Sequence, residues 1–516
     1  MKIGLGMLAA AAVVWGCSSA VGQTTTFAEA LKNAKGSEDD WNGLAKAKKV
    51  HEFRSVVGEK LAAMKFPGLK EVGRLPARDA KEISGSLFSV GCETLDRDYA
   101  DWDAYKACLA PLGVKHGRLF SGWAKTEQEK GKYDFTWLDK PVREMAAMGI
   151  RPWICLSYGN PIYGSDFRLG MKVCEVTENP EAFAAWLKYC AACVARYRDV
   201  VDEWEIWNEP FNQAEPYAKL FLATARAIRR VQPSAKCYCT AIRYDPTKGV
   251  NDYQVLLEKL KAENALDLGS YFIYHPYHAN PDNSYARWTE PLRALVKGYS
   301  PAFDVMQGES GCPAQLEFAH ALKFIEWSEA AQAKWNLRRA IGDAVRRVPT
   351  NLFSFMDLQY PFMLQSFGLV RSNTRKEFVY RRPSYFAMQN VYALVDDAVE
   401  PVGLEDEVAH KLIRRCDPRV KANHRISCAT FARGGGKLRF YWYADVVPSS
   451  ELGFDLVELA IPETIRRPHW TDMVTGRICV VPEKNVVRED GRTVLKAMPI
   501  WDAPVLVTDG SPATRD

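Results

Sequence analysis

The feature that most constrains the fold of this chain is an alternation of short apolar runs with longer amphipathic segments between residues 85 and 397. The apolar runs have the length of strands and cover residues 87–91, 114–120, 151–156, 202–207, 236–242, 271–274, 303–307 and 352–356. The segments between them repeat apolar residues at helical spacing, as at 135–148, 182–197, 218–231, 253–260 and 319–348. Eight strands that alternate with helices predict an α/β fold of the (β/α)8 TIM-barrel type. An open doubly wound sheet shares this alternation, but no Gly-rich phosphate-binding loop follows the first run.

The rest of the chain divides into further parts. After residue 397 the alternation stops, and strand-like runs at 437–443, 477–481, 493–496 and 504–508 predict a C-terminal all-β sandwich domain over 398–516. Just before it, residues 380–394 are expected to form the closing helix of the barrel. Residues 23–84 are rich in Ala, Lys and Glu without a strong strand, and they predict a helical lead-in packed on the barrel.

The first 22 residues have the pattern of a secretory signal. Lys2 precedes an apolar stretch at 5–15 that is too short to span a bilayer, and small residues follow it. Two processing sites remain open: cleavage before Gln23, or lipoprotein-type processing that would place a lipid anchor on Cys17. We therefore expect an exported protein that is periplasmic, extracellular or lipid-anchored, with no later segment able to cross a membrane.

Charge and cysteine usage exclude several classes of function. A net charge of +5 on 516 residues, without basic runs interleaved with aromatics, argues against nucleic acid as a partner. The 13 cysteines are scattered, so a disulfide-stapled small fold is excluded. Cys190 and Cys193 lie in a helical segment without a second Cys/His pair, and are expected to be buried thiols. No metal-ligand spacing stands out, and we expect neither a metal nor a cofactor.

Two glutamates stand where predicted strands meet their loops. Glu209 follows the fourth run and Glu309 follows the seventh, and active sites of such barrels lie at the carboxyl ends of the strands. Cleavage of a glycoside needs one carboxyl group to protonate the leaving oxygen and another to meet the positive charge that develops at the anomeric carbon. Trp207 and Phe211 beside Glu209 would favour its protonated form, whereas Arg118 would favour the carboxylate of Glu309.

The sequence around these glutamates resembles the clan A glycoside hydrolases, which are retaining enzymes on (β/α)8 barrels. Trp207-Asn208-Glu209-Pro210 is similar to the acid/base motif of that clan. The resemblance implies that Glu209 is the acid/base, that Glu309 is the nucleophile, and that Asn208 binds the 2-hydroxyl group of the substrate.

Two further matches extend the resemblance. His275-Pro276-Tyr277, at the end of the sixth run, is similar to a clan motif whose Tyr steadies the nucleophile, and Arg118 matches the usual Arg partner of the nucleophile. The order of a barrel followed by a late β-sandwich is most similar to families 39 and 5, over about residues 85–510.

Additional residues at the predicted barrel mouth are candidates for substrate binding. His275, Tyr158, Asn160, Trp123 and Asp357 are included on this ground, although Ser354-Phe355-Met356-Asp357 lacks the aromatic platform that many clan members carry at strand eight. Tyr163, Trp288 and Tyr360 could also form sugar platforms, with packing as the alternative for each of these aromatics.

Two local expectations follow from strand geometry. Glu205 has the parity for pointing into the barrel and is expected to be a paired structural group. Adjacent residues on a regular strand face opposite ways, so Asn208 and Glu209 can share a site only if the strand ends in a bulge.

The sequence thus predicts a retaining glycoside hydrolase that cleaves O-glycosidic bonds of carbohydrate substrates by double displacement. An exo-acting β-glycosidase on oligo- or polysaccharides is favoured, because insertions after the third and sixth runs could build the walls of a pocket. The alternatives are an endo-acting glycanase on the same scaffold and a non-catalytic carbohydrate-binding protein. A nucleotide-sugar transferase is disfavoured because no phosphate-binding loop is present.

Overall fold

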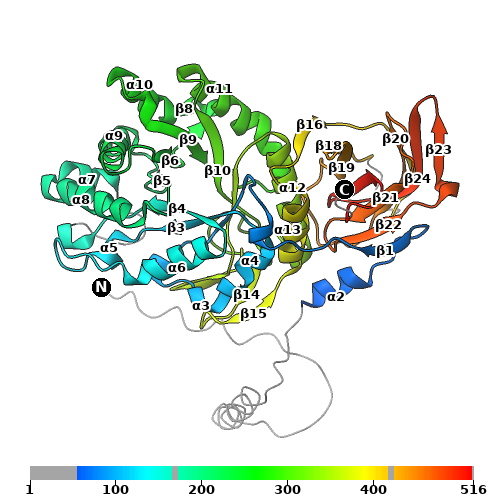
Figure 1. Cartoon of the computed structure of the whole chain (residues 1–516), viewed down its shortest axis with the longest axis horizontal. Helices are drawn as coiled ribbons and strands as arrows, with labels where there is room; N and C mark the ends of the chain where they lie inside the picture. Colours follow the sequence, from blue (N-terminus) through cyan, green and yellow to red (C-terminus); the bar gives the residue numbers. More distant parts are fainter. Residues whose placement is uncertain (1–54, 165–171, 417–422, 514–516) are drawn as a thin grey trace, which may run out of the picture. The chain divides into compact units, whose positions relative to one another are not determined.

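A computed structural model describes residues 55–164, 172–416 and 423–513 of the chain. The predicted signal segment and Cys17 lie outside these ranges. Eight parallel strands close into a barrel in the order β10-β11-β2-β3-β4-β5-β6-β9, which confirms the predicted fold class (Figure 1). The order of the strands around the barrel follows their order along the chain, so β5 is the fourth strand and β10 is the seventh.

Each of the eight predicted runs contributes a barrel strand. The strands are β2 (Phe88–Gly91), β3 (His116–Phe120), β4 (Arg151–Leu156), β5 (Glu203–Ile206), β6 (Lys236–Cys239), β9 (Gly269–Tyr274), β10 (Asp304–Ser310) and β11 (Thr350–Leu352). The last strand begins two residues before the predicted run and ends early. Beyond Leu352, single backbone hydrogen bonds from Phe353 to Ser310 and from Phe355 to Gly91 replace the regular ladder.

Helices follow the barrel strands. They are α3 (Trp102–Tyr105), α4 (Leu109–Leu112), α5 (Trp123–Thr126), α6 (Thr136–Ala147), α7 (Val173–Glu178), α8 (Pro180–Tyr197), α9 (Ala214–Val231), α10 (Asp252–Ala262), α11 (Glu290–Tyr299), α12 (Glu329–Val345) and α13 (Pro383–Leu394). None of the helices in the described ranges is long and apolar enough to cross a membrane. Cys190 and Cys193 lie buried and unbridged on α8, as expected.

The helix predicted over 319–348 is shorter in the structure, because α12 begins only at Glu329. His320, Leu322 and Phe324 have φ angles of 65°, 57° and 62°, in the left-handed region. An α-helix of L-residues cannot continue through such residues. Residues 319–328 therefore form irregular turns and not the start of the helix.

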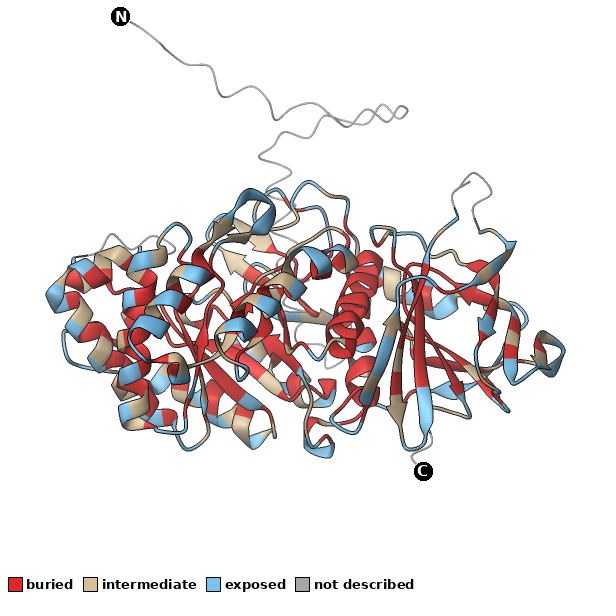
Figure 2. Cartoon of the chain, turned by 90° about the horizontal axis from the view of Figure 1, so that it is seen from above, coloured by how far each residue is buried: buried red, intermediate tan, exposed pale blue. Residues whose placement is uncertain are grey.

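Helix α12 is buried along its whole length, as Figure 2 shows in red. Its polar residues contact the C-terminal β domain. Lys334 Nζ donates to the carbonyl oxygen of Ser449 at 3.0 Å, and Arg338 Nη1 donates to that of Val446 at 2.8 Å. The helix therefore joins the barrel to the C-terminal domain through buried cations.

The C-terminal domain consists of two antiparallel sheets. One has the order β1-β22-β21-β25-β19-β18-β16 and the other β17-β20-β24-β23. Trp470 Nε1 of the first sheet donates to the carbonyl oxygen of Pro499 in the second at 3.1 Å, as expected for a sandwich. The strands are β16 (Glu400–Glu405), β17 (His410–Arg414), β18 (Ile426–Arg433), β19 (Gly436–Tyr443), β20 (Asp455–Ile461), β21 (Pro468–Asp472), β22 (Arg477–Val480), β23 (Val486–Glu489), β24 (Arg492–Ile500) and β25 (Val505–Asp509).

The described part of the lead-in differs from the helical prediction. Helix α2 (Val56–Ala63) is followed by strand β1 (Lys70–Arg74), which pairs with β22 as an edge strand of the seven-stranded sheet. All five residues of β1 are exposed. A strand without a buried face carries no alternating apolar pattern, so β1 could not be predicted from periodicity.

Short hairpins complete the chain between the barrel elements. They are formed by β7 (Tyr244–Asp245) with β8 (Val250–Asn251), β12 (Leu358–Tyr360) with β13 (Met363–Gln365), and β14 (Val370–Ser372) with β15 (Phe378–Arg381). The first hairpin extends the loop after β6 at the carboxyl end of the barrel and forms part of a pocket described below.

Candidate active site

Arg118, on β3, is the centre of the candidate site and is fully buried. Its Nη1 donates to Glu309 Oε2 and to Glu93 Oε1, both at 2.9 Å. Its Nε and Nη2 donate to the two oxygens of Glu205 at 2.8 and 2.9 Å, and Nη2 also reaches Asn208 Oδ1 at 2.8 Å. One guanidinium group therefore fixes four side chains from three other barrel strands or their ends. Glu205 is the buried, paired group that its strand parity indicates.

Glu309 is surrounded by groups that favour its ionised form. Tyr277 Oη donates to Glu309 Oε1 at 2.9 Å, while Arg118 holds the other oxygen. Burial alone would raise the pKa of Glu309, but the positive charges of His275 and Arg118, together with the hydrogen bond from Tyr277, outweigh burial and lower it. Glu309 is thus held as a carboxylate, which is the form that a nucleophile requires.

Two glycines let β10 present Glu309 at this position. A Cβ atom on Gly308 would collide with the side chain of Ile273 on β9, and one on Gly311 would collide with the backbone oxygen of Phe353. Any larger residue would push β10 away from its neighbours and displace Glu309.

Glu209 lies just after β5, where the backbone is irregular. Trp207 and Glu209 have φ angles of 68° and 50°, which non-glycine residues adopt uncommonly. These two residues break the alternation of the strand, so adjacent side chains need not face opposite ways. Asn208 bonds to Arg118 and donates to Tyr158 Oη at 2.9 Å, while Glu209 bonds to a different neighbour.

That neighbour is His275, whose Nδ1 lies 2.6 Å from Glu209 Oε1. Burial lowers the pKa of His275, but the charges of Glu309 and Glu209 outweigh burial and raise it above the ordinary value. The Glu209 side chain is 33 % exposed, compared with 14 % for Glu309. The two glutamates therefore differ in both partners and access to solvent.

The glutamates are close enough to act on one bond. One carboxylate oxygen of each, together with a ring nitrogen of His275, lie within 4.8 Å of one another. Retaining glycosidases hold their carboxyl groups about 5–5.5 Å apart, whereas inverting enzymes hold them about 6.5–9.5 Å apart. The same three side chains, Glu209, His275 and Glu309, could also hold a metal ion.

Three residues that the sequence placed at the site lie in the protein interior instead. Trp123 is fully buried and stacks on Tyr163 and Tyr189, with ring centroids 5.3 and 5.8 Å away. Its Nε1 donates to Glu127 Oε2. Trp123 thus offers no face to a substrate, because α5 turns its ring toward α8 rather than toward the barrel mouth.

Asn160 and Asp357 are likewise occupied by structural bonds. Asn160 caps a short helical turn and donates to the backbone oxygen of Glu127 at 2.7 Å. Asp357 is buried, forms a two-pronged ion pair with Arg382, and accepts two backbone N–H groups. Both were placed at the mouth because they follow strands, and strand ends also need groups that satisfy the backbone.

Glu93 was missed by sequence reasoning, although it follows the first barrel strand by two residues. It is buried between Arg118 and Asn351, and its Oε2 has no hydrogen-bond partner. Burial raises its pKa to about 7, despite the opposing charge of Arg118. The position of Glu93 just after a barrel strand is the sequence feature that could have identified it as a site residue.

Arg97 was also missed, and no signal in the sequence marked it. Its guanidinium carbon lies 5.2 Å from the ring centroids of both Tyr99 and Tyr158. Tyr360, a candidate platform, packs on Tyr99 at 4.6 Å. This cluster adjoins the site through Tyr158, which accepts a hydrogen bond from Asn208.

Comparison with known proteins agrees with the resemblance drawn from the sequence. The structure is similar to a family 39 glycoside hydrolase from Bacteroides cellulosilyticus, with a TM-score of 0.60, 19% identity, and coverage of 84% of this chain and 83% of that one. It is similar to a monomeric β-xylosidase from Caulobacter crescentus, with a TM-score of 0.51, 16% identity, and coverage of 85% and 97%. A GH30 endoxylanase from Clostridium papyrosolvens matches with a TM-score of 0.50, 11% identity, and coverage of 86% and 98%.

These likenesses show that this chain shares the fold of those enzymes. No protein-family model matches the sequence, and no curated protein matches it.

Proposed function

We propose that this protein is a retaining glycoside hydrolase that works by double displacement. The observation that carries the proposal is the pair of glutamates, Glu209 and Glu309, within reach of one bond and in unequal surroundings. Of the reactions that two such carboxyl groups support, cleavage of a glycosidic bond with retention uses both groups and requires this short separation.

In the first step Glu309 attacks the anomeric carbon while Glu209, protonated, gives its proton to the leaving oxygen. Arg118 and Tyr277 hold Glu309 ionised and fix the directions of its two oxygens. Asn208 is locked between Arg118 and Tyr158, and it can offer its amide to a hydroxyl group next to the anomeric carbon.

In the second step Glu209, now ionised, takes a proton from water, which releases the sugar from Glu309. The greater exposure of Glu209 allows water to enter on its side. His275, at 2.6 Å from Glu209, orients its carboxyl group in both steps.

Exo action on a β-glycoside is the finer part of the proposal. The loops after β5, β6 and β9 form the walls of a pocket beside Glu209, and walls that limit the length of the bound chain favour attack at a chain end. The similar structures named above include a β-xylosidase and an endoxylanase, so an endo-acting glycanase is the alternative on this scaffold.

The first experiment is a panel of aryl β-glycosides and oligosaccharides, with the product followed by proton NMR. A newly released sugar with the anomeric configuration of the substrate is expected. A fluorinated deoxy analogue of the best substrate should then label one peptide, the one that contains Glu309. An inverted product, or a label on another residue, would contradict the proposal.

We also propose that the enzyme acts outside the cytoplasm. The support is the signal-like pattern of residues 1–22, with Cys17 or the residues before Gln23 as the processing site. Mass spectrometry of the mature N-terminus from the source cells distinguishes the two sites. An intact N-terminus would contradict export.

A further inference from the structure

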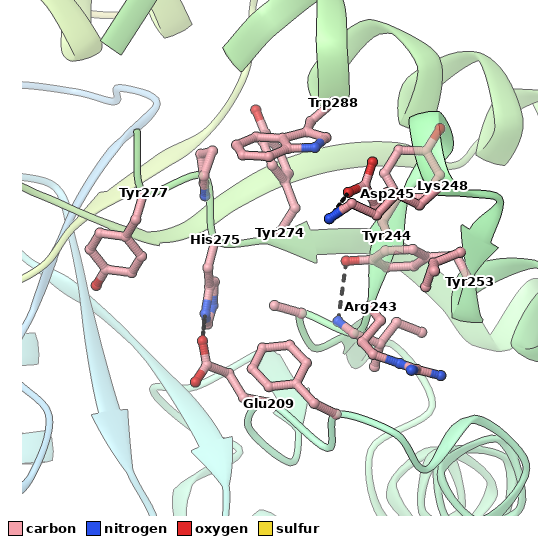
Figure 3. A pocket seen from close by; sticks show the side chains of 15 residues that line it. Glu209, Arg243, Tyr244, Asp245, Lys248, Tyr253, Tyr274, His275, Tyr277 and Trp288 are labelled. Atoms are coloured by element: carbon pink, nitrogen blue, oxygen red, sulfur yellow. Dashed lines mark hydrogen bonds and ion pairs between the residues drawn. The ribbon is translucent and has the colours of Figure 1, made fainter. Parts of the chain in front are cut away.

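A pocket of about 470 Å³ adjoins Glu209 (Figure 3). Glu209, His275 and Tyr277 form its inner end. Glu209 is the glutamate that lines it, whereas the Glu309 oxygens are taken by Arg118 and Tyr277. The pocket is therefore lined by Glu209, the proposed acid/base, and not by Glu309, the proposed nucleophile.

The pocket is walled by the ends of three neighbouring strands, β5, β6 and β9, and by the β7–β8 hairpin. Six of the fifteen residues that line the pocket carry aromatic rings, namely Phe211, Tyr244, Tyr253, Tyr274, Tyr277 and Trp288. Pockets of a few hundred Å³ with mostly apolar and aromatic walls are typical binding sites for small organic ligands.

The charged groups in the wall are bonded to one another. Arg243 donates to both oxygens of Asp252 at 3.0 and 3.1 Å. Lys248 and Arg287 each lie 3.4 Å from Asp245. A ligand in the pocket therefore meets charges that already have counter-charges.

Three of the four tyrosine hydroxyl groups in the wall are also occupied. Tyr253 Oη donates to the backbone oxygen of Ile273, and Tyr274 Oη lies 2.8 Å from Thr289 Oγ1. Tyr277 Oη donates to Glu309, as described above. A sugar ring buried here would lose the water around several hydroxyl groups and find few replacements, which is unfavourable. A flat aromatic ring would lose little.

We propose that this pocket binds an aromatic leaving group, so that the substrates are aryl β-glycosides. The inference rests on the proposed function, because it takes Glu209 as the acid. The carbon–oxygen bond between the anomeric carbon and the aryl oxygen breaks as the Glu309–carbon bond forms. The proton of Glu209 goes to the aryl oxygen, and a phenol departs into the pocket. Water then releases the sugar and returns the proton to Glu209.

The test compares two substrates with the same sugar and different leaving groups: a methylumbelliferyl β-glycoside and the β-glycosyl fluoride. Fluoride is too small to reach the aromatic wall. The variants are Phe211→Ala and Trp288→Ala, and the control is Phe378→Ala on β15, whose exposure of 43 % equals that of Phe211. The measurement is the ratio of kcat/KM for the aryl substrate to kcat/KM for the fluoride.

We expect both pocket variants to lower this ratio by about tenfold, and the control to leave it unchanged. Equal losses of kcat/KM on both substrates, or no loss on either, would overturn the assignment of the pocket to the leaving group. The proposed function would remain in place. A larger loss on a disaccharide of the same sugar than on the aryl glycoside would overturn the aromatic class. If the wild-type protein cleaves no glycoside at all, the proposed function fails and the pocket assignment fails with it.

Discussion

The surroundings of Glu309 and Glu209, on two sides of the barrel mouth, differ in how their charges are paired and in their exposure to solvent. Around Glu309, charged groups are buried and each is tied to Arg118, Tyr277 or His275. Around Glu209, one bond to His275 holds a half-exposed side chain at the end of an aromatic pocket. A group that attacks carbon must be fixed and ionised, whereas a group that exchanges protons needs access to solvent and to the leaving oxygen. The difference between the sides therefore assigns the roles better than either glutamate alone.

The largest expected effect contrasts the two glutamates. Glu309→Gln should lower kcat by on the order of 10⁴-fold or more on every substrate, because no attack occurs without it. Glu209→Gln should cost about 10²–10⁴-fold, with the smallest loss for leaving groups that need no proton. Steady-state kinetics on an aryl glycoside and a glycosyl fluoride measures both, with the exposed Glu290→Gln as control. Equal losses for both variants on both substrates would remove the distinction between the sides.

The next prediction concerns the stability of the Glu309 side. Arg118→Met leaves Glu93 and Glu205 buried without a cation, and should lower the free energy of unfolding by about 3–5 kcal/mol. The matched variant Arg143→Met removes an exposed pair with Asp199 and should cost less than about 1 kcal/mol. Urea unfolding compares the two. Similar losses would mean that the buried network is no more important than a surface ion pair.

A third prediction uses the pH dependence of the nucleophile. The pKa of Glu309 is lowered in the folded protein, so activity that needs its carboxylate persists below the ordinary pKa of a glutamate. Tyr277→Phe removes one cause of this shift, so the acid limb of kcat/KM should move to higher pH. Loss of a hydrogen bond to a charged group should also lower kcat/KM by about 10–100-fold.

Tyr299→Phe is the matched control for this variant, because Tyr299 Oη bonds to Glu258 far from the site on the outer helices. Its pH profile should follow that of the wild type. A Tyr277→Phe profile with an unmoved acid limb would show that Tyr277 does not hold the charge of Glu309.

The smallest expected effect concerns Glu93. Burial raises its pKa to about 7 in the folded state, so the folded protein binds a proton that the unfolded chain has released. Its contribution to the free energy of unfolding therefore falls as pH rises from the unfolded pKa to about 7. Glu93→Gln removes this dependence, and its stability relative to the wild type should rise by roughly 1–2 kcal/mol between pH 5 and 7. A constant difference across this range would contradict the prediction.

The sequence carried the barrel and the centre of the site because both rest on periodicity and on residues at strand ends. Runs of buried residues mark β4 and β5. Asn208 and Glu209 follow β5 closely, and Glu309 lies near the end of β10. The exposed edge strand β1 left no such pattern.

Side-chain direction could not be predicted in the same way. Trp123 and Trp288 both follow barrel strands, yet one ring packs into the core and the other lines the pocket. The left-handed residues Trp207 and Glu209, which turn Asn208 and Glu209 out of alternation, depend on the surrounding chain rather than on their own sequence.

The pairing of β1 with β22 also bears on how the chain reaches its native state. Lys70 lies opposite Val480, so two segments separated by the whole barrel and much of the C-terminal domain must meet to complete one sheet. During synthesis, β1 remains unpaired until β22 has been made. Contacts between such distant segments slow folding. The seven-stranded sheet can therefore be completed only after the chain has been synthesised through β22.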